Sequence, residues 1–446
     1  MRPDEMLIYD NLKILAETRP DKKCIINGSR ELTYPELTGI VDNIAFRLAG
    51  LVNKGDKVLV KCSDVIEQLC YLLGIAKLAA AAVLIDPFIP DTIYEDIKNK
   101  SAAVLCIDDK FCLPDTISPY PTKVTPEDLF LGALSSGSTG EHKLIWRDHQ
   151  SWVSAFPVQS RVFGLSGADT LFLCGSLVYT ANLNSCLHIL YEGGTVVIAA
   201  NTFPQTWLKD MVQHQVSAIF MVPAHYRALL KIVEAPFAQI KSLVSAGAKI
   251  NIDTVKDLLE CFPQAKLYEY YGASELGHVS FCTGEDLLKY PDTVGRAFPG
   301  VKLTLEDNLV WAASPYLAPA YRPKATVGDL GRIDPAGYLY LLGRENHLVN
   351  KGGVKIPLEG VEQILNRCPG VAEAAVKGVD DKIRGQKLAA WIVKSNPDLT
   401  AKEIKVFCRE NLPRQFCPQI IYFIDNLPRN YSGKLNREKL VQKDSP

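Results

Sequence analysis

The chain has 446 residues, 47% of them hydrophobic and 22% charged, which is the composition of a globular protein long enough for at least two domains. Its 49 lysines and arginines balance 50 aspartates and glutamates, leaving a formal net charge of -1. This balance disfavours a broad nucleic-acid-binding surface, so we expect small-molecule or protein partners and no nucleic acid.

The 12 cysteines occur singly, without a C-x-x-C pair, and the chain begins without the pattern of a secretory signal. Isolated cysteines are typical of free thiols in a reducing compartment, so we predict a cytoplasmic protein. The most hydrophobic segment, residues 69–85, contains Lys77 and ends at Asp86-Pro87. It is too short and too polar to cross a membrane comfortably, so we expect no integral membrane segment.

The first part of the chain alternates between helical and extended patterns. Apolar residues at helical spacing predict helices over 9–18, 35–48 and 65–77, and short apolar runs predict strands over 24–26, 32–34, 57–60, 82–85 and 129–133. The same alternation continues with a helix over 182–191 and strands over 170–174, 194–199, 218–222, 242–245 and 266–270. Strands that alternate with helices predict an α/β fold with parallel-rich sheets packed by helices.

The pattern changes after about Pro299. Short strands over 301–305, 309–312, 328–333 and 338–341, with a turn at 334–337, predict a small antiparallel region. Beyond Arg344 a separate α+β pattern follows, with helices over 358–367 and 401–411 and strands over 371–378, 388–394 and 419–424. We therefore predict a large N-terminal domain over 1–344 and a small, mobile C-terminal domain over 345–446.

A stretch rich in glycine and hydroxyl groups follows the predicted strand at 129–133. Its members that could contact an anion are Ser135, Ser136, Gly137, Ser138, Thr139, Gly140 and Lys143. Glycine allows successive backbone N–H groups to converge on an anion, and the hydroxyls and the lysine add donors. The stretch differs from the G-x-x-x-x-G-K-[ST] pattern because Ser138 occupies the lysine position. By itself it fits a phosphate-binding loop or a surface turn.

Four further stretches accompany this loop: Tyr-Tyr-Gly-Ala-Ser-Glu at 270–275, Val-Gly-Asp-Leu-Gly at 327–331, Gly-Arg-Glu-Asn at 343–346 and Pro-Arg-Asn-Tyr-Ser-Gly-Lys-Leu-Asn-Arg at 428–437. In order and approximate spacing the five stretches resemble the adenylate-forming enzymes. This superfamily includes acyl-CoA synthetases, peptide-synthetase adenylation domains and firefly luciferase. The resemblance covers nearly the whole chain and is closest in type to an acyl-CoA synthetase.

The resemblance implies an ATP and magnesium site, in which positive charge and aligned donors bring a carboxylate to the α-phosphorus. The stretch 135–143 would hold the β- and γ-phosphates. Tyr271 would pack on adenine, Ser274 would bond the α-phosphate, and Glu275 would hold magnesium. Gly247, Tyr270 and Gly272 complete the implied nucleotide-binding set on this side.

Further roles are implied for the later stretches. Asp329 would accept hydrogen bonds from the ribose, with Arg344 nearby, and Lys434 would reach the reacting carboxylate and α-phosphate. Lys434, Ser274 and Glu275 form the implied catalytic set. Each residue also has a structural alternative: a core aromatic for Tyr271, a helix start for Glu275, a turn cap for Asp329 and a solvated side chain for Lys434.

Several positions depart from the family pattern. Asn346 stands at the implied hinge, where Asp or Lys is usual, and we expect the hinge to survive because Asn tolerates unusual backbone angles. Glu141-His142 replaces the usual x-Pro before Lys143. Lys355 replaces a common arginine and Gly360 the first glutamate of a paired-acid signature, which puts both local roles in doubt.

The implied acid pocket lies between the glycine-rich stretch and Tyr271. Thr180 takes the place at which amino-acid-activating relatives carry an aspartate for the substrate ammonium, unless the alignment slips by one residue. A buried ammonium without a partner is costly, so an α-amino acid is disfavoured. The neighbours Tyr179, Val222 and Ala246 suit an aliphatic or aromatic carboxylate. Tyr179 either gates the pocket or belongs to the core.

The sequence therefore predicts an AMP-forming acid–thiol ligase, an acyl-CoA synthetase. A fatty or aryl acid would react with ATP to give acyl-AMP and pyrophosphate, and coenzyme A would then take the acyl group and release AMP. One alternative acceptor is the phosphopantetheine arm of an acyl or aryl carrier protein. A second alternative is a non-catalytic nucleotide- or acyl-binding protein.

Overall fold

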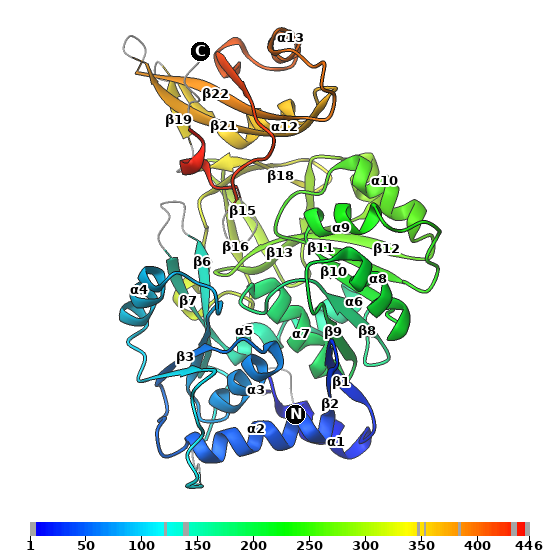
Figure 1. Cartoon of the computed structure of the whole chain (residues 1–446). Helices are drawn as coiled ribbons and strands as arrows, with labels where there is room; N and C mark the ends of the chain where they lie inside the picture. The colour runs from blue at the N-terminus through cyan, green and yellow to red at the C-terminus, as the bar shows by residue number, and fades with distance from the viewer. Residues whose placement is uncertain are drawn as a thin grey trace. The chain divides into compact units, whose positions relative to one another are not determined.

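The computed structural model describes residues 6–119, 123–136, 142–345, 348–351, 354–381, 385–429 and 435–441. The chain divides into two compact units, each described by itself (Figure 1). The N-terminal unit comprises Met1–Thr304, Trp311–Val327 and Asp334–Leu339, and the C-terminal unit comprises Leu305–Val310, Gly328–Ile333 and Tyr340–Pro446. The predicted α/β fold class is confirmed, and the domain boundary after residue 344 stays a prediction.

One sheet of the N-terminal unit has the strand order β5-β3-β4-β6-β7. Its strands are β3 (Lys57–Lys61), β4 (Ala81–Leu84), β5 (Leu105–Asp108), β6 (Leu129–Ser136) and β7 (His142–Asp148). Its neighbouring helices are α2 (Tyr34–Leu48), α3 (Val65–Ala76) and α4 (Asp91–Ser101). All pairs are parallel except β6 with β7. Helix α2 begins at a capping box of Thr33 and Glu36, with Pro35 in its first turn.

The second sheet of this unit has the order β14-β13-β12-β11-β10-β8-β9-β1-β2. Its strands are β1 (Lys23–Asn27), β2 (Arg30–Thr33), β8 (Thr170–Leu173), β9 (Thr195–Ile198), β10 (Ala218–Met221), β11 (Ser242–Ser245), β12 (Lys266–Ala273), β13 (Gly277–Thr283) and β14 (Thr293–Ala297). The strands from β1 to β12 in this order pair in parallel, and the antiparallel pairs β1–β2 and β12–β13–β14 flank them.

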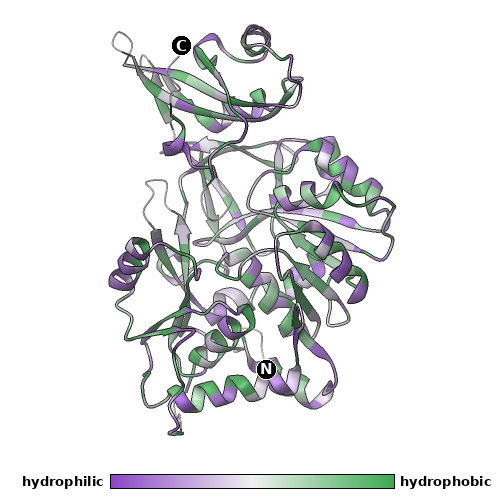
Figure 2. Cartoon of the chain, viewed as in Figure 1, coloured by the Kyte–Doolittle hydropathy of each residue, from purple (hydrophilic) through white to green (hydrophobic). Residues whose placement is uncertain are grey.

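Helices connect and cover these strands. They are α1 (Asp10–Thr18), α5 (His149–Val153), α6 (Phe156–Phe163), α7 (Thr180–Glu192), α8 (Pro204–Gln213), α9 (Pro223–Leu230), α10 (Ile252–Cys261) and α11 (Gly284–Lys289). Every residue of β4, β9, β10 and β11 is buried, because helices cover both faces of parallel sheets. In Figure 2 these strands are mainly apolar, whereas α4 is mainly hydrophilic.

Several element boundaries near the site differ from the prediction. Strand β6 continues through Ser136 and β7 begins at His142, so Ser135 and Lys143 lie in strands rather than in a loop. Helix α7 begins two residues early, at Thr180, and β12 continues to Ala273. In each case pairing or packing with a neighbouring element extends the structure into polar residues whose own pattern indicates a turn.

The C-terminal unit has its own core around the sheet β21-β22-β23. Its elements are β19 (Leu348–Lys351), β20 (Val354–Pro357), β21 (Val371–Asp381), β22 (Gly385–Lys394), β23 (Ile420–Phe423), α12 (Leu358–Leu365) and α13 (Ala401–Asn411). The stretch before it forms β15 (Lys302–Glu306), β16 (Leu309–Ala313), β17 (Asp329–Ile333) and β18 (Leu339–Arg344). Strands β16 and β17 are antiparallel, as predicted.

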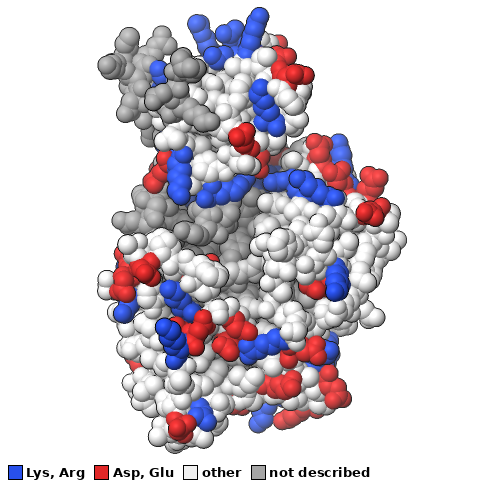
Figure 3. Space-filling view, viewed as in Figure 1, with Lys and Arg blue, Asp and Glu red and all other residues white. Residues whose placement is uncertain are grey.

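Within the described ranges, no helix combines the length and the apolar character needed to cross a membrane. On the face drawn in Figure 3, acidic and basic side chains are interspersed over the N-terminal unit. This distribution agrees with the nearly balanced formal charge of the sequence.

Candidate active site

The glycine-rich stretch is built on a β-hairpin. Ser135 of β6 lies directly opposite Lys143 of β7, and Ser136 pairs with His142. Ser135 is half-buried and Lys143 is exposed. The predicted phosphate-binding residues Gly137, Ser138, Thr139 and Gly140 lie outside the described residues. The structure therefore describes only the two paired strands on either side of them.

The start of α7 contacts the turn that follows β12. The Thr180 and Ser274 hydroxyl oxygens are 3.2 Å apart, within hydrogen-bond distance, although 94 positions separate the two residues. The prediction assigns Thr180 to the acid pocket and Ser274 to the α-phosphate. The structure brings these two residues together.

Three other predicted residues converge beside α7. Gly247 has a φ of +86°, and a Cβ atom added there would lie 2.3 Å from the Tyr179 hydroxyl and 3.5 Å from Val222 Cγ1. A larger residue there would be strained at this positive φ and would require the Tyr179 hydroxyl to move. Burial raises the pKa of Tyr179 to about 12, so its hydroxyl stays protonated at neutral pH. Ala246 is buried just before Gly247, at the end of β11.

The two tyrosines of the 270–275 stretch have different environments. Tyr270 is buried, and its ring lies 4.5 Å from the His278 ring across the β12–β13 hairpin. Tyr271 is half-buried and points to the opposite face of the strand. A Cβ atom on Gly272 would lie 2.4 Å from the Gly277 carbonyl oxygen, so this hairpin requires glycine there. Half-buried Ser274 and Glu275 form its turn.

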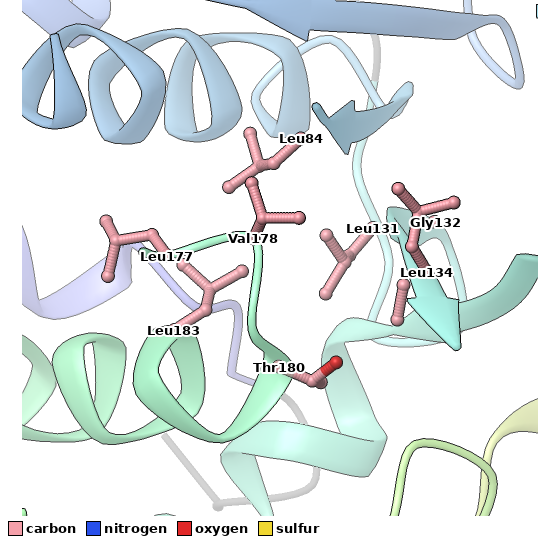
Figure 4. A pocket seen from close by; sticks show the side chains of 9 residues that line it. Leu84, Leu131, Gly132, Leu134, Leu177, Val178, Thr180 and Leu183 are labelled. Carbon is pink, nitrogen blue, oxygen red and sulfur yellow. The ribbon is translucent and has the colours of Figure 1, made fainter. Parts of the chain in front are cut away.

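A small cavity lies beside Thr180, between β6 and the segment that leads into α7. Thr180 is its polar side chain, and the other lining residues are Leu84, Leu131, Gly132, Ala133, Leu134, Leu177, Val178 and Leu183 (Figure 4). None of these lining residues carries a carboxylate. The cavity measures about 10 Å³, room for about one water molecule, so it shows the apolar surroundings of Thr180 and is too small to be the acid pocket itself.

In the C-terminal unit, Asp329 and Arg344 form an ion pair. Arg344 Nε lies 2.9 Å from Asp329 Oδ1, and the aspartate is 5% exposed. The Glu345 N–H donates to the Gly328 carbonyl over 2.8 Å, which holds the end of β18 beside the start of β17. Lys434 and the hinge candidate Asn346 lie outside the described residues.

Gly360 replaces the first glutamate of the paired-acid signature, and two nearby glutamates contact an arginine. Arg437 Nη2 lies 2.6 Å from Glu362 Oε2 and 3.2 Å from Glu359 Oε1. Burial raises the pKa of Glu362 to about 7, and Arg437 opposes this rise. Two carboxylates thus contact this arginine without a glutamate at 360. The Lys355 side chain lies outside the described residues.

Sequence reasoning missed Arg147, the buried arginine of β7. Its Nη1 donates to the Ser274 carbonyl over 3.0 Å, and the side chain is 1% exposed. The signal in the sequence was the pair Arg147-Asp148 at the end of an apolar strand, where charged residues are rarely buried without partners.

The chemistry of the turn fits magnesium bound together with a nucleotide. Among the described residues no group of three or more His, Cys, Asp or Glu side chains could hold a metal ion. Magnesium commonly takes one or two carboxylates together with phosphate oxygens and water, so a turn that offers Glu275 alone is a suitable donor.

Two family models match the chain: the AMP-binding enzyme model over residues 12–118 and 108–310, and the AMP-binding enzyme C-terminal domain model over 360–434. The chain belongs to the AMP-binding enzyme family. This confirms the resemblance to the adenylate-forming superfamily.

Curated relatives of this AMP-binding enzyme carry ligase names. An uncharacterized acyl-CoA ligase, YhfT, of Bacillus subtilis (strain 168) is 28% identical over 475 residues, covering 98% of each chain. The 3-hydroxybenzoate–CoA ligase of Aromatoleum sp. (strain CIB) is 24% identical, over 96% of this chain and 94% of that protein.

Solved structures share the fold. The o-succinylbenzoate CoA synthetase (MenE) of Bacillus subtilis, in complex with an acyl-adenylate intermediate, superposes with a TM-score of 0.86 at 21% identity. The match covers 98% of this chain and 99% of that one. A Mycobacterium tuberculosis fatty acyl CoA synthetase gives a TM-score of 0.75 at 21% identity, with 97% of each chain covered.

Proposed function

We propose that this AMP-binding enzyme is an acid–CoA ligase. ATP, held with Mg²⁺, reacts with a carboxylic acid to give acyl-AMP and pyrophosphate, and the coenzyme A thiol then displaces AMP. The acyl-CoA ligase names of full-length relatives support this reaction class.

One observation supports the proposal most strongly. The Thr180 hydroxyl, assigned to the acid pocket, lies 3.2 Å from the Ser274 hydroxyl, assigned to the α-phosphate. A carboxylate that attacks the α-phosphorus must lie within about 3–3.5 Å of it, so the two binding sites have to adjoin. A protein that only binds nucleotide would not need an acid-binding site next to its α-phosphate site.

We propose the remaining roles on the same basis. The hairpin 135–143 holds the β- and γ-phosphates, Tyr271 packs on adenine, and Glu275 holds Mg²⁺. Gly247, Tyr270 and Gly272 line the nucleotide-binding site beside Tyr271. Asp329 and Arg344 bind ribose, and Lys434 stabilises the charge that develops at the reacting carboxylate.

The apolar surroundings of Thr180, together with the pocket candidates Tyr179, Val222 and Ala246, support an aliphatic or aromatic acid over an α-amino acid. Coenzyme A is the proposed acceptor, and a carrier-protein phosphopantetheine presents the same thiol. Among relatives, Enterobactin synthase component E of Escherichia coli (strain K12) is 26% identical over 95% of this chain and 92% of that protein.

The test is an acid-dependent ATP–pyrophosphate exchange screen over fatty, aryl and amino acids, followed by addition of coenzyme A or a phosphopantetheinylated carrier protein. We expect exchange with a fatty or aryl acid and thioester formation with coenzyme A. Exchange with amino acids alone would refute the acid class. Thioester formation only on the carrier protein would refute the acceptor.

A further inference from the structure

Arg147 supports the Ser274–Glu275 turn from inside the protein. Its Nη1 donates to the Ser274 carbonyl over 3.0 Å and lies 3.5 Å from the Glu275 carbonyl. Its Nη2 donates to the Tyr316 carbonyl over 2.7 Å and to the Ser151 carbonyl over 3.4 Å. One planar guanidinium thus joins the turn to two other segments through backbone oxygens.

The turn is also held by the segment 316–318. The Ala318 N–H donates to the Glu275 carbonyl over 2.9 Å. At Gly277 the φ is +68°, and a Cβ atom would lie 2.8 Å from the Tyr316 carbonyl oxygen. The 316–318 segment therefore packs directly on the turn, and Arg147 contacts backbone oxygens of both segments.

Arg147 keeps its charge at neutral pH in this buried position. Burial lowers its pKa to about 10, while the charges of Asp148 and Glu275 act in the opposite direction. Asp148 is itself fully buried and forms an ion pair with Arg322 at 2.8 Å. A buried cation is expensive, and a strand position of this kind is more cheaply filled by an apolar side chain.

We propose that Arg147 is a positioning residue for nucleotide activation. It fixes the backbone of Ser274 and Glu275, so that the hydroxyl and the carboxylate keep the orientation needed for the α-phosphate and Mg²⁺, and it adds a fixed positive charge behind these anionic groups. The inference rests on the proposed roles of Ser274 and Glu275.

The experiment compares Arg147→Gln and Arg147→Lys with the wild-type chain. Calorimetry measures MgATP binding, and exchange assays measure the Mg²⁺ concentration for half-maximal rate and the KM for the acid. We expect Arg147→Gln to weaken MgATP binding and raise the Mg²⁺ requirement about 10-fold, the effect of losing charged hydrogen bonds, with the acid KM within about 3-fold. The MgATP affinity and the Mg²⁺ requirement of Arg147→Lys should lie between those of the wild type and Arg147→Gln, because lysine keeps the charge but not the planar guanidinium group.

Arg322→Gln is the matched control. It removes a neighbouring guanidinium that pairs with Asp148. We expect it to lower the melting temperature and leave MgATP binding within about 2-fold, because it removes none of the Arg147 contacts. Hydrogen exchange in peptide 273–277 should accelerate in Arg147→Gln but not in the control.

Wild-type MgATP binding and Mg²⁺ requirement in folded Arg147→Gln would overturn the inference, as would equal losses in Arg322→Gln. If Arg147→Gln gives no cooperative thermal transition, an unchanged Mg²⁺ requirement in Arg147→Lys overturns it. If wild-type protein binds MgATP but shows no exchange with any acid, the proposed function fails, and the binding measurements still decide the role of Arg147.

Discussion

At the residue scale, Gly247 allows a sharp test of the proposed acid site. In Gly247→Ala the added Cβ meets the Tyr179 hydroxyl at 2.3 Å, so the ring must move. We expect the KM for the acid to rise at least about 10-fold, the effect of a displaced contact worth roughly 1.4 kcal/mol. MgATP affinity should fall by less, because the displaced Tyr179 is assigned to the acid pocket, whereas Gly247 itself belongs to the implied nucleotide-binding set. Steady-state kinetics in the exchange assay measure both values.

Gly55→Ala is the control for backbone strain. Gly55 has a φ of +87°, against +86° at Gly247, and nothing lies within 4 Å of its added Cβ. Both substitutions carry the strain of alanine at positive φ, about 1 kcal/mol, and Gly247→Ala carries in addition the cost of moving Tyr179. Equal acid KM values in the two variants would show that Tyr179 does not contact the acid site.

Lys434 gives a second residue-scale prediction. Lys434→Ala should reduce exchange at least about 100-fold, because one preorganised charge at a transition state contributes a factor of this order. ATP affinity should stay within a few-fold. Parallel exchange and calorimetry measure the two effects, and near-normal exchange would refute the assigned role.

The sequence indicated some of the site residues and not others. Thr180, Ser274, Tyr179 and Gly247 were selected through the family resemblance, and the structure brings them together in pairs. Arg147 was not selected. The pair Arg147-Asp148 after an apolar run indicates a buried charge that needs partners, but the partner at Ser274 is 127 positions away and cannot be read from the local sequence.

At the element scale, short α5 and the chain before α1 meet at His149. Its Nδ1 accepts from the Ile8 N–H over 3.3 Å, and its ring stacks on Phe130 at 5.1 Å. Burial lowers the pKa of His149 to about 3, from 6.5. The native state thus binds this proton less readily than the unfolded chain, so the stability contribution is full above about pH 6.5 and is lost as pH falls toward 3.

His149→Phe should therefore reduce the loss of unfolding free energy between pH 7 and pH 5. The substitution keeps an aromatic ring against Phe130 but removes the titration and the acceptor for Ile8, so the variant is less stable at pH 7. Urea unfolding at both pH values measures the difference. His214→Gln, at the end of α8, is the control. The same pH dependence in His149→Phe and the wild type would contradict this assignment.

Elements with strong periodic signals were predicted well. Strand β11 and helix α13 have the predicted bounds, and β8, β9 and β10 differ by one residue at one or both ends. Helix α4 and the strands β5, β7, β13, β14, β19 and β20 were not assigned, and no bounds were predicted for α5, α6, α8, α9, α10 and α11. Helix α4 carries only two buried residues, Ile97 and Ser101, so its apolar stripe is weak. The hairpin strands depend on pairing with neighbours that their own residues do not indicate.

At the scale of the whole molecule, we propose that movement at the hinge residue Asn346 is needed for thioester formation but not for adenylate formation. Asn346→Pro fixes φ near −65° and restricts the preceding residue, so it should block a change of backbone conformation there. We expect acid-dependent exchange to persist within about 3-fold, while thioester formation falls at least about 100-fold. Exchange and thioester assays on one preparation measure both, and parallel loss of both activities would argue against a hinge.

The family and the α/β fold could be predicted because five motifs recur in order over nearly the whole chain. The acid could not be identified, because its pocket is assembled from distant segments around Thr180 and Gly247, whose shared environment appears only after folding. The cytoplasmic location, the acceptor and the roles of all the assigned site residues, Asn346 and Lys434 among them, stay predictions.

The central claim, that a carboxylate attacks the α-phosphorus of ATP, is tested most directly by isotope transfer. The enzyme is incubated with MgATP, coenzyme A and the best acid of the exchange screen, labelled with oxygen-18 in its carboxylate. Because the attacking oxygen stays on phosphorus when the thiol displaces AMP, we predict AMP carrying one oxygen-18 and an equal amount of acyl-CoA. Unlabelled AMP, or ADP and phosphate as products, would contradict the acyl-adenylate mechanism.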